Sequence, residues 1–175
     1  MTPDDIVDPL RPLQRLSDAL RDTIHLRPGA QRDITPDIAQ LLGTWRWAQS
    51  LDPAAPILAR DLVSLCNHLD ALTQAEPEPI MLADAPRIDR WCAAVVDNLP
   101  VPVGVVTGHP RLRKGARTMT SPLIRIALDK GWARTFSRYN LLGRPDRAVL
   151  AALRAKGRLR ADAQFFNVPI AGGWT

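Results

Sequence analysis

The chain has 175 residues, enough for one domain of ordinary size or two very small ones. Hydrophobic residues make up 46% of it, which excludes wholesale disorder, and no apolar run reaches the roughly 18 residues of a membrane span. The start, MTPDDIVDPL, is acidic and lacks the layout of a secretion signal, so we expect a cytoplasmic protein without a membrane partner. Cys66 and Cys92 have unrelated spacing and are expected to be buried free thiols.

Charge is distributed unevenly along the chain. Residues 1–108 carry nine arginines and no lysine against fifteen acidic residues, a net charge of −6. Residues 109–160 carry eleven arginines and three lysines against two acidic residues, a net charge of +12. This asymmetry predicts that the second part of the chain meets an anionic partner. Two alternatives stay open: the two parts neutralise each other within one fold, or the arginine usage reflects a GC-rich genome.

The first hundred residues are expected to be mainly helical. Leucines recur every three or four residues, and prolines stand just inside the expected helix starts, as at Thr35-Pro36 and Asp52-Pro53. We expect four helices: one from near Asp8 or Arg11 to about Leu26, and others at about 36–48, 53–72 and 87–98. An acidic, proline-rich connector at 75–86 separates the last two.

The residues that follow change in character and predict a small sheet. Val101–Thr107, Thr118–Asp129 and Trp132–Leu142 are rich in β-branched and apolar residues, so we expect a three-stranded antiparallel meander over 101–143. Lys130-Gly131 is the expected two-residue turn of its second hairpin. A last helix is expected at 145–156, before Gly157.

These elements predict an α+β fold: an N-terminal helical, bundle-like half packed with a small three-stranded antiparallel β-meander and a C-terminal helix. The expected division lies near residue 86, between an acidic helical region, 1–86, and a basic α/β region, 87–175. A meander of about 45 residues is marginal on its own, so we expect both regions to share one core.

The expected hairpin brings arginines and aromatic rings to one face. A turn at Lys130-Gly131 places Arg125 opposite Phe136, with Trp132 and Arg134 on the same side. Single-stranded nucleic acids are bound in this way, since bases stack on rings for ~1–3 kcal/mol each and arginines bind phosphates. The candidate nucleic-acid-binding residues of this face and of the neighbouring loop are Arg111, Arg113, Lys114, Arg117, Arg125, Trp132, Arg134, Phe136 and Arg138. The alternative is that helices cover the rings and leave the arginines at the rim.

Three functions follow from this reading. The leading hypothesis is a non-enzymatic nucleic-acid-binding or accessory protein. The second is an adaptor or inhibitor, associated with a phage or mobile element, which docks on an acidic protein partner. The third is a small metal-independent nuclease, for which His109 and Tyr139 are the candidate proton-transfer residues. We expect no cofactor and no metal, because nucleotide-binding glycine loops and closely spaced cysteine ligands are missing; the sequence leaves the oligomeric state open.

Three segments resemble a known pattern. The segments are GHPRL at 108–112, TSPL at 120–123 and ARTFSRYNLLG at 133–143. Together they are similar to an uncharacterised family of small bacterial proteins, a domain of unknown function. The resemblance implies that residues 101–143 fold together as a small β-meander, and it implies no activity.

Overall fold

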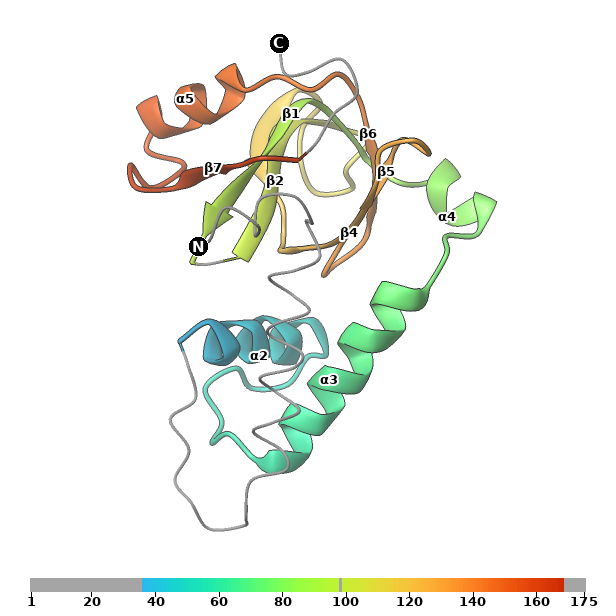
Figure 1. Cartoon of the computed structure of the whole chain (residues 1–175), viewed down its shortest axis with the longest axis vertical. Coiled ribbons are helices and arrows are strands. Elements are labelled where there is room, and N and C mark those ends of the chain that lie inside the picture. The colour runs from blue at the N-terminus through green and yellow to red at the C-terminus, as the bar shows by residue number, and fades with distance from the viewer. Residues whose placement is uncertain (1–35, 98, 169–175) are drawn as a thin grey trace. The chain divides into compact units, whose positions relative to one another are not determined.

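A computed structural model describes residues 36–97 and 99–168 of the chain (Figure 1). The expected first helix, which ends near Leu26, lies outside the described residues. The chain divides into two compact units on either side of the Ala75–Glu76 bond. We call residues 36–75 of the first the helical unit, and residues 76–97 and 99–168 of the second the sheet unit. No helix among the described residues is long and apolar enough to cross a membrane.

The helical unit consists of α2, Pro36–Ala48, and α3, Ala59–Gln74. Its core is a set of leucines at helical spacing: Leu41, Leu42, Leu62, Leu65 and Leu69. The second expected helix is confirmed, but the third begins later than expected. Pro56 disfavours helical geometry at the residue before it, and the carboxylate of Asp52 accepts a hydrogen bond from the Ala54 amide (2.9 Å) within a turn.

The buried Arg46 fixes the segment between the two helices. Its guanidinium donates to the carbonyl oxygens of Ala55 (2.5 Å) and Pro56 (2.9 Å) and pairs with Asp61 (2.5 Å). These bonds satisfy a charge that is only 3% exposed, and the Arg46 guanidinium holds the pKa of Asp61 below its usual value. Arg46 therefore has a structural role within the helical unit.

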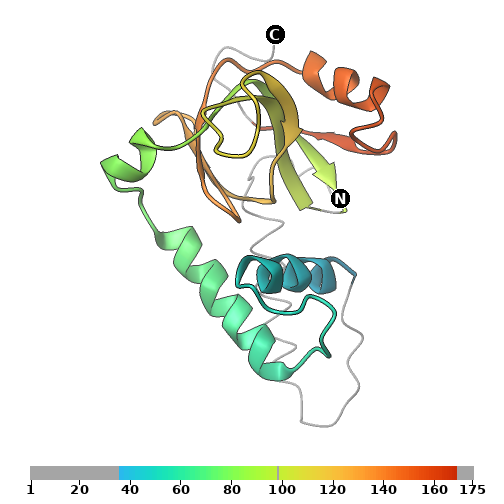
Figure 2. The ribbon, with the colours of Figure 1, turned by 180° about the vertical axis from the view of Figure 1, so that it is seen from behind.

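The sheet unit is built on a seven-stranded mixed sheet with two helices. Its elements are α4 (Pro79–Ala83), β1 (Arg87–Val96), β2 (Leu99–Thr107), β3 (Ala116–Met119), β4 (Leu123–Ala127), β5 (Trp132–Thr135), β6 (Tyr139–Leu142), α5 (Ala148–Ala155) and β7 (Gln164–Phe166). The strand order is β3-β2-β1-β6-β5-β4, and β7 pairs with β1. β1 and β6 are parallel, and the other paired strands are antiparallel. The sheet curls so that β4, at one edge, approaches β2 (Figure 2).

The expected combination of a helical, bundle-like half with a three-stranded meander is therefore wrong. The described fold is a sheet-rich α+β fold with four helices. The largest error concerns residues 87–98, expected as a helix and found as β1. Residues 91–94 of this strand are all buried, so it shows a continuous apolar run that periodicity cannot distinguish from a helix. A bulge between Asp89 and Cys92, with Arg90 at a positive φ of 44°, further breaks the alternation expected of a strand.

The expected last strand, Trp132–Leu142, is in fact two strands. A tight turn at 136–138 separates β5 from β6, and both the amide and the hydroxyl of Thr135 donate to the carbonyl oxygen of Arg138 (2.9 and 3.0 Å). The hairpin of β4 and β5 pairs Ala127 with Trp132, so residues 128–131 form the connection in place of Lys130-Gly131 alone. The register thus differs by two residues from the expected one.

Two helices cover different parts of the sheet. α5 occupies the segment expected to be helical and packs Val149, Leu150 and Leu153 against Cys92 of β1 and Val103 of β2 (Figure 1). Leu82 of α4 and the nearby Ala85 pack against Trp132 and Tyr139 of β5 and β6. Each of these two hydrophobic clusters therefore has a helical cover.

Candidate functional site

Two short turns of the sheet unit lie beside each other. The turn at 120–122 and the turn at 136–138 are joined by hydrogen bonds. The hydroxyls of Ser121 and Ser137 lie 2.9 Å apart, and the Ser137 amide donates to the Ser121 hydroxyl (3.0 Å). The Phe136 amide donates to the Pro122 carbonyl oxygen (2.8 Å). This linkage fixes the position of Arg138, which follows Ser137.

The loop 108–115 connects β2 to β3. The imidazole Nδ1 of His109 accepts a hydrogen bond from the Arg111 amide (3.1 Å), which folds the start of the loop back on itself. Burial lowers the pKa of His109, and the positive charges of Arg138 and Arg111 lower it further. The imidazole is therefore neutral near pH 7 with its proton on Nε2. The charge of Arg138, in the turn at 136–138, thus acts on an imidazole of this loop.

The loop 108–115, the start of β3 and the turn at 136–138 carry a set of cationic side chains, which we call the basic end. Its side chains are those of His109, Arg111, Arg113, Lys114, Arg117 and Arg138. Arg111, Arg113 and Lys114 are exposed, and the other three are half-buried. Among the described residues, none of these six forms an ion pair with a carboxylate; ion pairs of the basic segment 109–160 involve Arg125, Lys130 and Arg160 instead. The charge of the basic end is therefore not compensated within the described part of the fold.

The structure corrects the expectation of an exposed aromatic face. Arg125, Trp132 and Arg134 do share one face of the hairpin, because a register difference of two residues preserves the alternation of sides. The indole of Trp132, however, is only 1% exposed, and Phe136 is only 3% exposed. The ring of Trp132 is covered by Leu82 and Ala85, as the alternative interpretation anticipated. Neither ring is available to stack on a base.

The two residues proposed for nuclease chemistry lie in different surroundings. Tyr139 is 8% exposed and packs edge-to-face on Trp132, with ring centroids 5.6 Å apart. It belongs to the hydrophobic cluster under α4, whereas His109 belongs to the basic end. The structure thus places His109 beside Arg111 and assigns Tyr139 a packing role.

Neither cysteine forms a disulfide, and both are buried, as expected. Among the described residues, no group of three or more histidine, cysteine or acidic side chains could hold a metal ion. Burial raises the pKa of the Cys92 thiol to about 12, so this side chain is an inert part of the core beneath α5.

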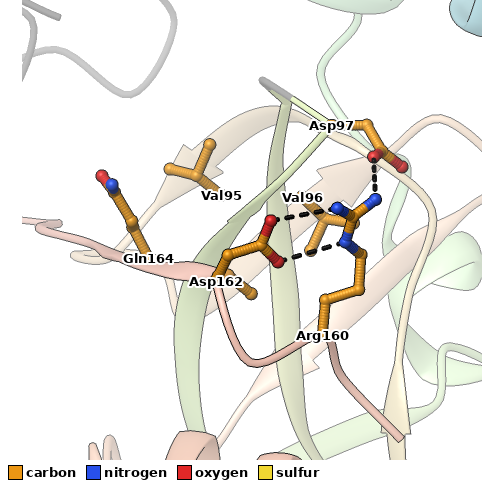
Figure 3. Close-up of a pocket in the computed structure, with 7 residues that line it drawn as sticks. Val95, Val96, Asp97, Arg160, Asp162 and Gln164 are labelled. Atoms are coloured by element: carbon orange, nitrogen blue, oxygen red, sulfur yellow. Dashed lines mark hydrogen bonds and ion pairs between the residues drawn. The ribbon is translucent and has the colours of Figure 1, made fainter.

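A separate surface pocket of about 390 Å³ lies beside the end of β1 (Figure 3). Its most polar side chain, Arg160, pairs with Asp162 (3.0 Å) and lies 3.9 Å from Asp97. These two carboxylates neutralise the guanidinium, so the pocket does not share the uncompensated charge of the basic end. No sequence pattern indicates this pocket, since it depends on β1 and β7 being neighbours.

A model of a family of unknown function, DUF6634, matches residues 58–170 of the chain. The match begins just before α3 and includes every strand of the sheet unit together with the basic end. Searches of curated proteins and of solved structures found no match to the chain.

Proposed function

The chain belongs to this family of unknown function, which supplies no activity, and we propose a function from the residues themselves. In this proposal the protein binds nucleic acid through the phosphate backbone and catalyses no reaction. The observation that carries this proposal is the uncompensated charge of the basic end. Five arginine and lysine side chains gather there, and none has a carboxylate partner among the described residues.

Phosphate contacts suit this arrangement of side chains. Arginine presents a planar fork of donors that matches phosphate oxygens, and neutral His109 adds one donor at Nε2 without adding charge. Among the described residues of the sheet unit, no aromatic side chain is strongly exposed, so base stacking contributes little there. We therefore propose binding that depends on backbone charge and shows weak preference for base sequence.

The proposal is tested by fluorescence anisotropy of labelled single-stranded RNA, single-stranded DNA and duplex DNA, titrated with the full chain. If the five cations of the basic end each neutralise about one phosphate, affinity should fall by roughly 100- to 500-fold between 50 and 200 mM salt. A logarithmic salt slope near −4 is the expected result. Absence of binding to all three probes at 50 mM salt would contradict the proposal.

A second candidate function is docking on an acidic protein. The burial of Trp132 and Phe136 supports this second candidate, because a cationic surface without stacking rings suits carboxylates as well as phosphates. An adaptor or inhibitor of this kind is expected to form a stoichiometric protein complex and to show no nucleic-acid affinity at physiological salt. The same titration therefore separates the two functions.

A further inference from the structure

We propose that Arg125, Lys130 and Arg134 form a second anion-binding site, which Glu76 occupies in the free protein and which a nucleic-acid phosphate takes over on binding. The site lies on the face of β4 and β5 and is distinct from the basic end. The inference rests on the proposed nucleic-acid binding, since it names a phosphodiester as the ligand. The inference also assigns a role to Glu76, whose carboxylate competes with the phosphate for this site.

The two arginines of this site are held side by side. Arg125 of β4 lies directly opposite Arg134 of β5 in the ladder. Like charges in this position repel each other, so each guanidinium needs a compensating contact. Arg125 lies over the ring of Trp132, 5.3 Å from its centroid, and Arg134 lies over the ring of Tyr139, 4.8 Å from its centroid. Stacking on rings orients two neighbouring forks of donors.

Glu76 compensates one side of this pair. Its carboxylate binds the guanidinium of Arg125 (2.5 Å) and the ammonium of Lys130 (3.3 Å). The hydrogen bond from Arg125 is the main reason that the pKa of Glu76 lies below its usual value. Glu76 comes from the acidic segment 75–86, and its carboxylate sits where one oxygen pair of a phosphate would bind.

Arg134 retains unused capacity for a ligand. Its Nε is buried and has no hydrogen-bond partner among the described residues. Burial also lowers the pKa of this guanidinium from its ordinary value, and no carboxylate of the described residues offsets the effect. A buried donor without an acceptor is unfavourable, so an added anion between Arg125 and Arg134 would satisfy it.

The carboxylate of Glu76 is an exchangeable occupant. The side chain of Glu76 is 53% exposed, and that of Lys130 is 52% exposed. Ion pairs at this exposure contribute little to stability and are screened by salt, so they yield to a stronger anion. A bound polyanion supplies several phosphates at once, and its attachment at the basic end raises the local phosphate concentration at the second site.

The test compares two substitutions in the same acidic segment. Glu76→Gln removes the competing carboxylate, whereas Glu78→Gln removes the same charge from an exposed side chain that forms no ion pair among the described residues. We expect Glu76→Gln to raise affinity for a labelled single-stranded oligonucleotide about fivefold or more at 50 mM salt and to steepen the logarithmic salt slope by about 1.5, because two cations become free. Glu78→Gln should change affinity less than twofold.

A further variant shows whether the gain arises at this site. Adding Arg125→Ala and Lys130→Ala to Glu76→Gln should return affinity to the wild-type value or below it. Equal effects of Glu76→Gln and Glu78→Gln, with the wild-type chain still binding, would overturn this inference and leave the proposed function intact. If neither the wild-type chain nor Glu76→Gln binds, this inference and the proposed function are both overturned. If Glu76→Gln alone binds, the competing role of Glu76 is supported.

Discussion

Replacing Arg111 and Arg113 together by alanine is expected to weaken nucleic-acid binding about tenfold or more at 150 mM salt and to reduce the logarithmic salt slope by about 1.5. Both side chains are exposed in the loop 108–115 and have no carboxylate partner among the described residues. Each lost phosphate contact retains about one counterion on the nucleic acid, so the slope reports how many contacts disappeared. Anisotropy titrations at four salt concentrations measure both quantities.

The matched control removes the same charge elsewhere. Arg60 and Arg160 are exposed, with 81% and 71% of their side chains accessible, and each has an acidic neighbour. Their joint replacement by alanine should change affinity less than about twofold, because a compensated charge attracts a phosphate less strongly. Equal losses in the two double variants would mean that net charge governs binding, and the assignment to the basic end would then be incorrect.

Replacing Trp91 by alanine is expected to destabilise the sheet unit by about 3–5 kcal/mol. The side chain is 2% exposed, and its indole Nε1 donates to the carbonyl oxygen of Gly143 (3.0 Å). Its backbone also accepts from the Asp146 amide (2.8 Å) and donates to the Arg144 carbonyl oxygen (3.2 Å). Trp91 therefore joins the bulge of β1 to the segment that leads from β6 into α5. Removing the ring leaves a large cavity and an unpaired carbonyl oxygen.

Equilibrium unfolding in urea, followed by circular dichroism, measures this loss. Trp47→Ala is the control, because the side chain of Trp47 is 67% exposed and its removal should cost less than about 1 kcal/mol. If Trp91→Ala unfolds within about 1 kcal/mol of the wild-type chain, the central position of β1 in the sheet is incorrect.

Local signals in the sequence predicted some elements of the fold well. Pro36 and the leucines after it mark α2, and Gly157, at a positive φ of 61°, follows the end of α5. Gly131, at a positive φ of 71°, lies in the connection between β4 and β5, as its place in the expected turn suggested. These features depend on the conformational preferences of a few adjacent residues.

The sheet could not be predicted in the same way. β1 is buried on both faces, pairs with three other strands and carries a bulge at Arg90, so its sequence resembles that of a helix. Its parallel pairing places Arg87 beside Leu141, 54 residues later in the chain. Contacts over such distances depend on strand order, which local propensity does not determine.

The charge of the candidate site could be predicted from the sequence, but the arrangement of its side chains could not. The excess of basic residues after residue 108 identified Arg111, Arg113 and Arg138, but no sequence motif predicts the hydrogen bonds between Ser121 and Ser137 that hold the turn of Arg138. The aromatic face was wrong because the prediction left out α4, whose Leu82 covers Trp132. The acidic segment 75–86 was interpreted only as a connector, although Glu76 binds Arg125.

The most direct test of the account is to locate a bound nucleic acid on the protein by ultraviolet cross-linking to labelled single-stranded RNA, followed by mass spectrometry of the cross-linked peptides. The account predicts cross-links within residues 108–117 and 136–139, and their loss in the Arg111→Ala/Arg113→Ala variant. Cross-links confined to α2 and α3, or none at 50 mM salt, would contradict it.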